Sequence, residues 1–285
     1  MATGVSKSEL QRRLFSKGFE PSRALGQNFL VDANIARKIA SEAAAGQLPR
    51  AIEIGPGAGS LTIFLAESFE QVLAIEADRA LVAELQSLLM DRQIVNVDVV
   101  NGDALQFDFV HADLALLPTV LVGNLPYNIA SQIILRVLEH AWYVESMVVM
   151  VQAEMADRLL APAGSRNSSA FGVHVALMAR TRSVLTVPSS VFIPSPKVAS
   201  KVIRLDRIRD PISVVDPCLY ATLIWVIKTT FGHRRQMLRR VLSSEQSSVV
   251  ASLGIEVTRR PESLLMEEWI AIAQGLEEAG IGAPR

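Results

Sequence analysis

Four consecutive residues, Asn124, Leu125, Pro126 and Tyr127, combine groups that suit methylation of an exocyclic amine. The amino nitrogen of adenine is a poor nucleophile because its lone pair is delocalised into the ring. Acceptors on its two hydrogens return electron density to the nitrogen, and an Asn carbonyl and a backbone carbonyl beside Pro are suitable acceptors. Tyr127 adds an aromatic face for base stacking. The same residues also fit a plain strand that ends in a proline turn.

A glycine-rich loop, Gly55-Pro56-Gly57-Ala58-Gly59, follows the apolar run 51–54. Glycine suits a chain that turns sharply and brings its backbone close to a ligand. The spacing differs from the dinucleotide fingerprint, and Pro56 lacks the N–H that a phosphate cradle would use. With Glu53 in front, the loop resembles the Glu-x-Gly-x-Gly-x-Gly loop of enzymes that bind S-adenosylmethionine. A nucleotide site and a tight turn without a ligand are the alternatives.

Two acidic residues follow the next apolar runs. Glu76 lies 21 positions after Gly55, where a carboxylate can accept from both ribose hydroxyls. Asp103 is placed to accept from the adenine amine of a donor. Parallel sheets bind ligands at the carboxyl ends of their strands. The ordered series Gly55, Glu76, Asp103 and Asn124 therefore predicts a methyl-donor site, although either acid alone also fits a solvated loop.

Apolar runs that alternate with amphipathic segments must position these residues. Asp32 is the expected N-cap of a helix that stops at Gly46. The pattern predicts an α/β fold, a parallel, doubly wound sheet covered on both faces. Strands are expected at 51–54, 72–75, 97–100, 119–122, 146–151 and 202–205, and further helices near 61–65, 79–90 and 129–138.

The last third of the chain has a different texture. Residues 183–198 are Pro-rich and extended, and Phe192 in that stretch fits either base stacking or a buried plug. After 210 the pattern is helical, with segments near 217–230, 233–242, 246–252 and 267–276. We expect a methyltransferase domain over 1–208, including a basic N-terminal segment 1–31, and a small all-α RNA-binding domain over 209–285.

Composition restricts the class of protein. Half of the 285 residues are hydrophobic and one fifth are charged, which is typical of a globular chain. The single cysteine, Cys218, excludes an internal disulfide and a cysteine-rich metal site, and it indicates a reducing, cytoplasmic setting. Residues 1–20 lack the apolar core of a secretory signal, and proline and glycine interrupt the uncharged stretch 114–135, so no membrane span is expected. No metal is expected, and the chain is expected to be a monomer.

The net charge of −1 hides an asymmetry. Residues 51–179 hold 5 Lys and Arg against 15 Asp and Glu, whereas residues 180–240 hold 12 against 3. A basic stretch beside an acidic domain indicates a surface for a polyanion, although such charges also occur as an ordinary solvated pattern. Candidate RNA-binding residues are Lys201, Arg204, Arg234, Arg235 and Arg239, with Arg207, Arg209, Lys228, Arg240, Lys7, Arg12, Arg13, Lys17 and Arg23 as further candidates. Arg235 and Arg239 are expected on one helix face.

Over nearly its whole length the chain resembles the bacterial small-subunit (16S) rRNA adenine N6,N6-dimethyltransferases. The matching stretches are Leu25 to Leu30, Glu53 to Gly59, Ile75 to Asp78, Gly102 to Ala104, Gly123 to Ile129, Val151 to Glu154, Val191 to Val198 and Phe231 to Arg235.

The resemblance implies a Rossmann-like fold and dimethylation of two adjacent adenosines in the 3′-terminal hairpin of 16S rRNA within the 30S subunit. S-adenosylmethionine would be the donor, and a role in small-subunit biogenesis follows. Asn28 and Leu30 would line the donor site. Gly55, Glu76 and Asp103 would hold the donor. Asn124 would bridge donor and acceptor, and Phe192 would stack on the target base opposite Tyr127.

Two departures from the family pattern concern RNA contacts: Phe171-Gly172-Val173-His174 and Gln236. A large-subunit rRNA adenine methyltransferase of the Erm type is the nearest alternative. A DNA adenine methyltransferase would need a target-recognition domain, which is not evident. A third alternative is an assembly checkpoint factor in which methylation is secondary.

Overall fold

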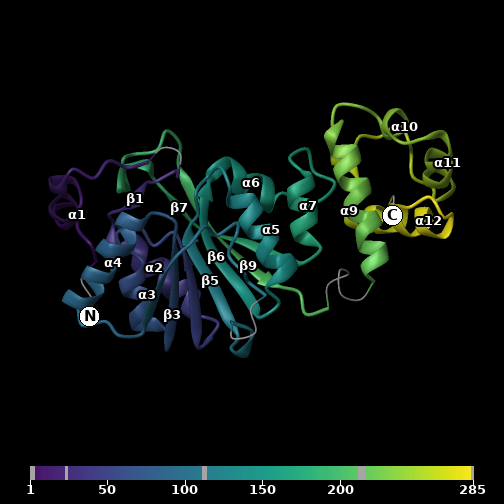
Figure 1. Cartoon of the computed structure of the whole chain (residues 1–285). Coiled ribbons are helices and arrows are strands. Elements are labelled where there is room, and N and C mark those ends of the chain that lie inside the picture. Colours follow the sequence, from purple (N-terminus) through teal and green to yellow (C-terminus); the bar gives the residue numbers. More distant parts are fainter. Residues whose placement is uncertain (1–3, 23–24, 111–113, 211–215, 284–285) are drawn as a thin grey trace. The chain divides into compact units, whose positions relative to one another are not determined.

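The computed structural model describes residues 4–22, 25–110, 114–210 and 216–283, without the side chain of Lys17 (Figure 1). The chain divides into two compact units, 1–156 with 182–207, and 157–181 with 208–285. The chain passes from the first unit to the second for the last time between 207 and 208, near the boundary expected at 208. Residues 157–181, expected in the first domain, lie in the second unit, where His174 Nε2 is 2.6 Å from Tyr220 Oη. The assignment of donor binding and RNA binding to separate domains stays a prediction.

The first unit is built on a sheet of seven strands in the order β4-β3-β2-β5-β6-β9-β7. The strands β4 (Val97–Asn101), β3 (Gln71–Glu76), β2 (Arg50–Ile54), β5 (Thr119–Asn124) and β6 (Val144–Gln152) are mutually parallel, and β9 (Ser200–Arg207) runs antiparallel to β6. The predicted α/β sheet is confirmed, and so is each predicted strand, but the sheet is only mostly parallel because the predicted strand 202–205 (β9) runs antiparallel. The sequence pattern missed β7 (Ala179–Val187).

Helices α2 (Ala33–Ala44), α3 (Thr62–Ser68) and α4 (Arg79–Asp91) share one hydrophobic core with the strand residues Ala51, Val72, Val120 and Val148. The alternate strand residues, such as Ile52 and Leu121, are equally buried, so both sheet faces are covered. On α5 (Ala130–His140), one apolar stripe that includes Ile133 and Val137 is buried. Asp32 caps α2 as predicted, because its carboxylate accepts from the amides of Asn34 and Ile35.

A two-stranded sheet, β1 (Phe29–Leu30) with β8 (Phe192–Ile193), joins two segments that are far apart in the chain. Phe29 pairs with Ile193 and Leu30 pairs with Phe192 in antiparallel register. The N-terminal segment therefore lies beside the Pro-rich stretch, which sequence spacing did not predict.

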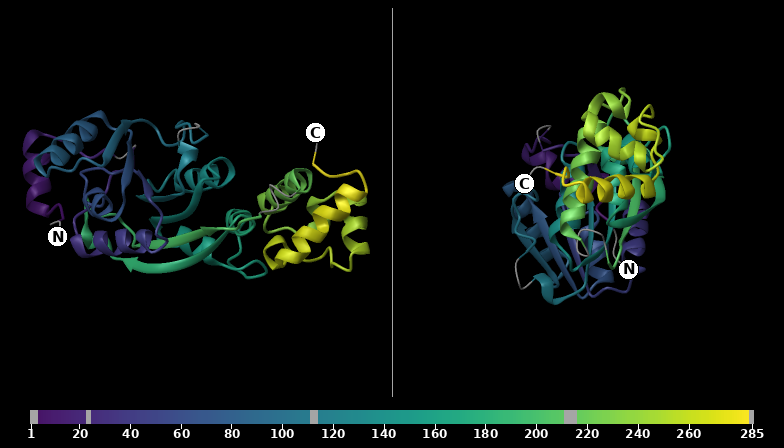
Figure 2. Two further views of the ribbon diagram at one scale, coloured as in Figure 1. Left: turned by 90° about the horizontal axis from the view of Figure 1, so that it is seen from below. Right: turned by 90° about the vertical axis from the view of Figure 1, so that its right-hand side faces the viewer.

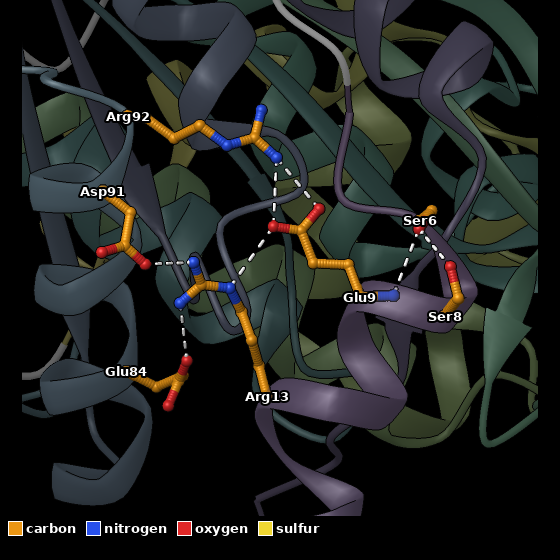
Figure 3. A network of polar contacts seen from close by, with 7 residues as sticks. All are labelled: Ser6, Ser8, Glu9, Arg13, Glu84, Asp91 and Arg92. Atoms are coloured by element: carbon orange, nitrogen blue, oxygen red, sulfur yellow. Dashed lines mark hydrogen bonds and ion pairs between the residues drawn. The ribbon is translucent and has the colours of Figure 1, made fainter.

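Helix α1 (Lys7–Arg13) is tied to α4 by an ion-pair network (Figure 3). The Arg13 guanidinium contacts Glu9 at 3.3 Å, Glu84 at 3.0 Å and Asp91 at 2.5 Å, and Arg92 binds Glu9 at 2.9 Å. Below these charges, Leu10 and Leu14 of the α1 segment are buried. The basic face of α1 expected for RNA is thus partly used inside the protein.

The second unit contains α7 (Ala170–Ala176), α9 (Pro217–Gly232), α10 (Leu238–Val241), α11 (Ser244–Ser252) and α12 (Met266–Glu278). Helices α9 and α12 lie side by side (Figures 1 and 2), with Phe231 stacked on the buried Trp269. The predicted helix over 233–242 is wrong, because turns at 233–236 separate α9 from the short α10. Helix α6 (Ala153–Leu160) lies between β6 and α7 in the chain.

Among the residues that the structure describes, none of the helices has both the length and the apolar character needed to cross a bilayer.

Candidate active site

The carboxyl ends of β2, β3 and β5 bring the predicted donor residues to one edge of the sheet. The register places Ile54 beside both Ile75 and Gly123, so Gly55, Glu76 and Asn124 follow at neighbouring strand ends. A Cβ on Gly123 would lie 2.5 Å from the Ile54 carbonyl oxygen, which explains why glycine precedes Asn124. A cavity of about 300 Å³ opens at this edge, and its lining includes the predicted residues Asn28, Gly55, Gly57, Glu76, Asp103, Asn124 and Pro126.

The glycine loop bends as its composition requires. Gly55 has φ +67° and Gly57 has φ +55°, a region that other residues rarely adopt. A Cβ on Gly57 would lie 3.1 Å from the Phe29 ring, because β1 packs directly over the loop. The exposed backbone of this loop can therefore approach a ligand closely from the cavity side.

Glu76 is 7% exposed and is held by the backbone around it. Its Oε2 accepts from the Gly57 amide at 3.0 Å, and its Oε1 accepts from the Asp78 amide at 3.0 Å. Burial raises the pKa of Glu76, and these amide contacts partly offset that rise. Each oxygen retains a lone pair, which fits the predicted role of accepting from two hydroxyls.

Asn124 carries the most informative polar atom of the site. Its Nδ2 donates to the Asn28 carbonyl oxygen at 2.9 Å, which orients the amide. Its Oδ1 is buried and has no hydrogen-bond partner within the described residues. A buried acceptor without a partner is costly, and it marks a position where a bound donor group completes the site.

Two further polar residues lie at the site: Glu53, which opens the glycine-loop motif, and Gln27, for which no separate role was predicted. Glu53 is 1% exposed, and burial raises its pKa to about 8, with the nearby Thr62 hydroxyl acting in the opposite direction. Its Oε2 has no partner in the described structure and adjoins a cavity of about 40 Å³ that Leu30 and Asn124 also line. Gln27 lines the main cavity and donates to Asp78 Oδ2 at 2.9 Å. An acid at the end of an otherwise apolar strand was the available signal for Glu53.

The remaining residues predicted for the acceptor side differ in exposure. Leu125 is buried, and its amide donates to the Met150 carbonyl at 3.1 Å. Tyr127 is half-buried, and its Oη lies 2.7 Å from Ser200 Oγ. Phe192 is only 2% exposed in β8 within the core, so its ring has no open face here. Base stacking by Phe192 stays a prediction that this conformation does not support.

The predicted RNA-binding residues separate into buried and exposed groups. Arg204 is 8% exposed and binds Glu42 and Asp206, so its proposed RNA contact is wrong in this structure. Arg207 likewise donates to main-chain carbonyls, including those of Val144 and Leu138. Lys201 is half-buried on β9 opposite Val151.

In the second unit, Arg234, Arg235 and Arg239 are exposed. Arg235 lies in a turn and Arg239 lies in α10, so the expectation of one shared helix face is wrong. The candidate Arg23 lies outside the described residues, as does the side chain of Lys17. The described residues contain no group of three or more His, Cys, Asp or Glu that could hold a metal ion.

Comparison with known proteins gives consistent matches. The family model described as "Ribosomal RNA adenine dimethylase" matches residues 18–277. A protein named "Ribosomal RNA small subunit methyltransferase A" from Acidothermus cellulolyticus is 40% identical over 95% of this chain and 94% of its own length. A protein of the same name from Moorella thermoacetica is 39% identical over 92% of this chain and 94% of its own.

Two solved structures share the fold. A dimethyladenosine transferase from Plasmodium falciparum superposes with a TM-score of 0.76 at 22% identity, covering 89% of this chain and 99% of that one. The 23S rRNA methyltransferase ErmE superposes with a TM-score of 0.65 at 26% identity, covering 87% and 99%. Both chains match across the sheet-bearing part and beyond, since the coverage exceeds the length of the first unit.

Proposed function

This chain belongs to the ribosomal RNA adenine dimethylase family, and on that premise we propose that its substrate is the small-subunit (16S) rRNA. It is an S-adenosylmethionine-dependent rRNA adenine N6,N6-dimethyltransferase. The proposed targets are two adjacent adenosines in the 3′-terminal hairpin within the 30S subunit, and the product is N6,N6-dimethyladenosine at both positions. The protein is proposed to act in the cytoplasm, as a monomer, during small-subunit biogenesis.

The single observation that carries this proposal is that Oδ1 of Asn124, a residue of the cavity lining, is buried without a hydrogen-bond partner among the described residues. Methylation of an adenine amine needs an acceptor at the place where N6–H arrives, and Asn124 holds such an acceptor. The names of the relatives at 38–40% identity support the small subunit as the source of that adenine.

The cavity fits the proposed donor. The left-handed glycines leave room for a backbone approach, the buried Glu76 carboxylate suits ribose hydroxyls, and Asp103 on the rim suits an adenine amine. Asn28 lines this cavity and also the smaller one beside Glu53, where Leu30 lies. When bound, S-adenosylmethionine would supply a methyl group activated by its sulfonium: the N6–carbon bond would form as the sulfur–carbon bond breaks, with S-adenosylhomocysteine as the leaving group.

The protein activates and aims the amine. Asn124 Oδ1 accepts one N6 hydrogen, and the Leu125 carbonyl before Pro126 is proposed as the second acceptor. The Pro126 carbonyl already accepts from the Ile129 amide at 3.1 Å, which closes the turn. Both hydrogen bonds strengthen as positive charge develops on the nitrogen, so they stabilise the transition state more than the ground state. The amine loses its proton after transfer, and no strong general base is required.

The target base must leave its stack to reach this turn. Tyr127 follows Pro126 and is proposed to receive the extruded base on its ring face. Binding energy from the surrounding rRNA offsets the cost of unstacking, which explains why a whole subunit rather than a nucleoside is the proposed substrate.

A basic surface of the second unit supports the RNA partner. Arg234 Nη2 donates to the Arg166 carbonyl at 2.5 Å, so the loop that carries Arg166 lies beside the turn 233–236. Arg166, Arg235 and Arg239 are exposed. We include the loop that carries Arg166 in the proposed rRNA-binding surface, because it lies beside the arginines that the sequence predicted for RNA binding. Contacts of this kind give affinity and salt dependence more than sequence choice.

The Erm-type alternative shares the fold, but it is less supported. ErmE is 26% identical to this chain, whereas small-subunit methyltransferases reach 40% over a similar share of it. The checkpoint role remains compatible with an active site that is intact.

The experiment that tests the proposed function is transfer of radiolabelled methyl groups into isolated 30S subunits that lack the modification. 50S subunits and duplex DNA are run in parallel as competing acceptors. We expect label in the 30S sample alone. Label in the 50S sample alone would assign the chain to the Erm type. Donor binding without any methyl transfer would favour the checkpoint role.

A further inference from the structure

We propose that Ser200 is a positioning residue for methyl transfer, because its hydroxyl fixes the ring of Tyr127 in the orientation that receives the target adenine. This inference rests on the proposed function, since it assumes that Tyr127 stacks on an extruded base. Ser200 belongs to none of the motifs that identified the site from the sequence.

The contact joins two segments 73 positions apart in the chain. Tyr127 Oη lies 2.7 Å from Ser200 Oγ, a normal length for a hydroxyl pair. Ser200 is fully buried at the first residue of β9, where it pairs with Gln152 of β6. Its position is fixed further by the neighbouring bond from the Ala153 amide to the Ala199 carbonyl at 3.0 Å. The serine is therefore a rigid anchor.

The backbone on either side of Tyr127 is held by separate hydrogen bonds. The Leu125 amide is bonded to Met150, and the Ile129 amide closes the turn on Pro126. With the backbone held on one side and the hydroxyl on the other, the half-buried ring cannot swing about χ1 without breaking the contact to Ser200. Burial raises the pKa of Tyr127, so the phenol stays neutral and keeps its O–H at physiological pH.

A fixed ring matters because the amine nitrogen must meet Asn124 Oδ1. Asn124 and Tyr127 lie in the same turn, three positions apart. A base stacked on a ring that has swung away about χ1 would carry its amine away from that acceptor. Small errors of placement at a reacting centre cost rate rather than affinity. Loss of the Ser200 contact is therefore expected to lower kcat while KM for the subunit and the Kd for S-adenosylmethionine stay near their normal values.

The test compares Ser200→Ala, Tyr127→Phe and the double variant in methyl transfer to 30S subunits. Each single change removes the same hydroxyl pair, so we expect each to lower kcat by about tenfold, the effect of one net hydrogen bond. The double variant should lose no more than either single variant, since both remove one interaction. Ser200→Thr keeps the hydroxyl and should restore most of the rate.

The matched control is Ser146→Ala. Ser146 is 4% exposed on β6, next to β9, and its Oγ has no hydrogen-bond partner within the described residues. The variant should keep the wild-type kcat. Melting temperature and donor Kd are measured for all variants, so that general loss of structure is recognised by a fall in both.

Each outcome is informative. If the wild-type protein methylates 30S subunits and Ser200→Ala has the same kcat, the positioning role is overturned while the proposed function stands. Additive losses in the double variant, or a loss equal to that of Ser146→Ala, would also overturn it. Absence of wild-type transfer to 30S subunits would instead contradict the proposed function.

Discussion

At the scale of single residues, the chemistry depends on one amide oxygen. In the part of the chain that the structure describes, Asn124 Oδ1 is buried without a hydrogen-bond partner, and the bond from Nδ2 to the Asn28 carbonyl orients the amide. A preoriented acceptor stabilises a charge that develops on the amine nitrogen without further reorganisation.

Asn124→Ala should abolish most methyl transfer and keep the donor Kd within about tenfold, since only one contact to the donor region is removed. Isothermal titration with S-adenosylmethionine and single-turnover transfer to 30S subunits measure the two quantities separately. Near-normal turnover in this variant would show that the amide does not activate the amine.

Glu53 predicts a dependence of stability on pH. Its pKa rises from 4.5 to about 8 on folding, mainly because the carboxyl is buried. Between these values the folded protein keeps a proton that the unfolded chain has released. The free energy of unfolding therefore falls as pH rises through this window.

Glu53→Gln should remove that fall and be the more stable protein near pH 8. Urea unfolding at several pH values checks it, with the exposed Glu145→Gln on β6 as control. Parallel pH profiles for Glu53→Gln and wild type would contradict the assignment.

Residue types indicated much of the site before the fold was known. Gly55, Glu76, Asp103 and Asn124 were predictable because strand alternation places successive strand ends together. Burial was harder to predict. Arg204 looks like a surface residue by its charge, and Phe192 fits either a stacking face or a buried plug, yet β9 and β8 bury both side chains, since their exposure depends on neighbours far along the chain.

At the scale of elements, local periodicity was sufficient for the parallel strands and their helices. It failed where tertiary pairing decides the structure, as in β7 and in the β1–β8 pair. It also failed over 233–242, where an apolar and basic pattern is divided by turns before Leu238 enters the core. Residues 157–181 belong to the second unit, which local periodicity also failed to predict, because the order of segments along the chain does not show which helix a segment packs against.

The ion pairs between α1 and α4 are expected to stabilise the docking of α1. Arg13→Ala removes the group shared by Glu9, Glu84 and Asp91, and should destabilise the docking of α1 by about 1–2 kcal/mol. Hydrogen exchange in residues 5–14 should accelerate, and more so at low salt than at high salt relative to wild type.

Arg12→Ala is the matched control, because Arg12 lies on the same helix with an exposed side chain. Equal exchange rates in Arg13→Ala and Arg12→Ala would show that burial of Leu10 and Leu14 alone holds the helix.

At the scale of the whole molecule, the chain combines a unit built on the parallel sheet with a helical unit that carries exposed arginines. The match of residues 18–277 to one family covers parts of both. The segregation of charge along the sequence predicted a polyanion surface, and the exposed Arg234 and Arg235 are compatible with it.

Arg234→Glu with Arg235→Glu should weaken 30S binding and reduce its salt dependence, because fewer counterions are released on binding. Filter binding at two salt concentrations measures both effects. The control is Arg37→Glu with Lys38→Glu, an adjacent exposed pair on α2 that reverses the same number of charges. Equal weakening by both double variants would show that total charge, rather than this surface, governs binding.

The most direct test of the central claim is nucleoside mass spectrometry of 16S rRNA after reaction of the wild-type protein with unmodified 30S subunits, with Asn124→Ala in parallel. We predict N6,N6-dimethyladenosine at two adjacent positions of the 3′-terminal hairpin, and none with the variant. Modification at another site, or equal modification by the variant, would contradict the substrate or the chemistry assigned to Asn124.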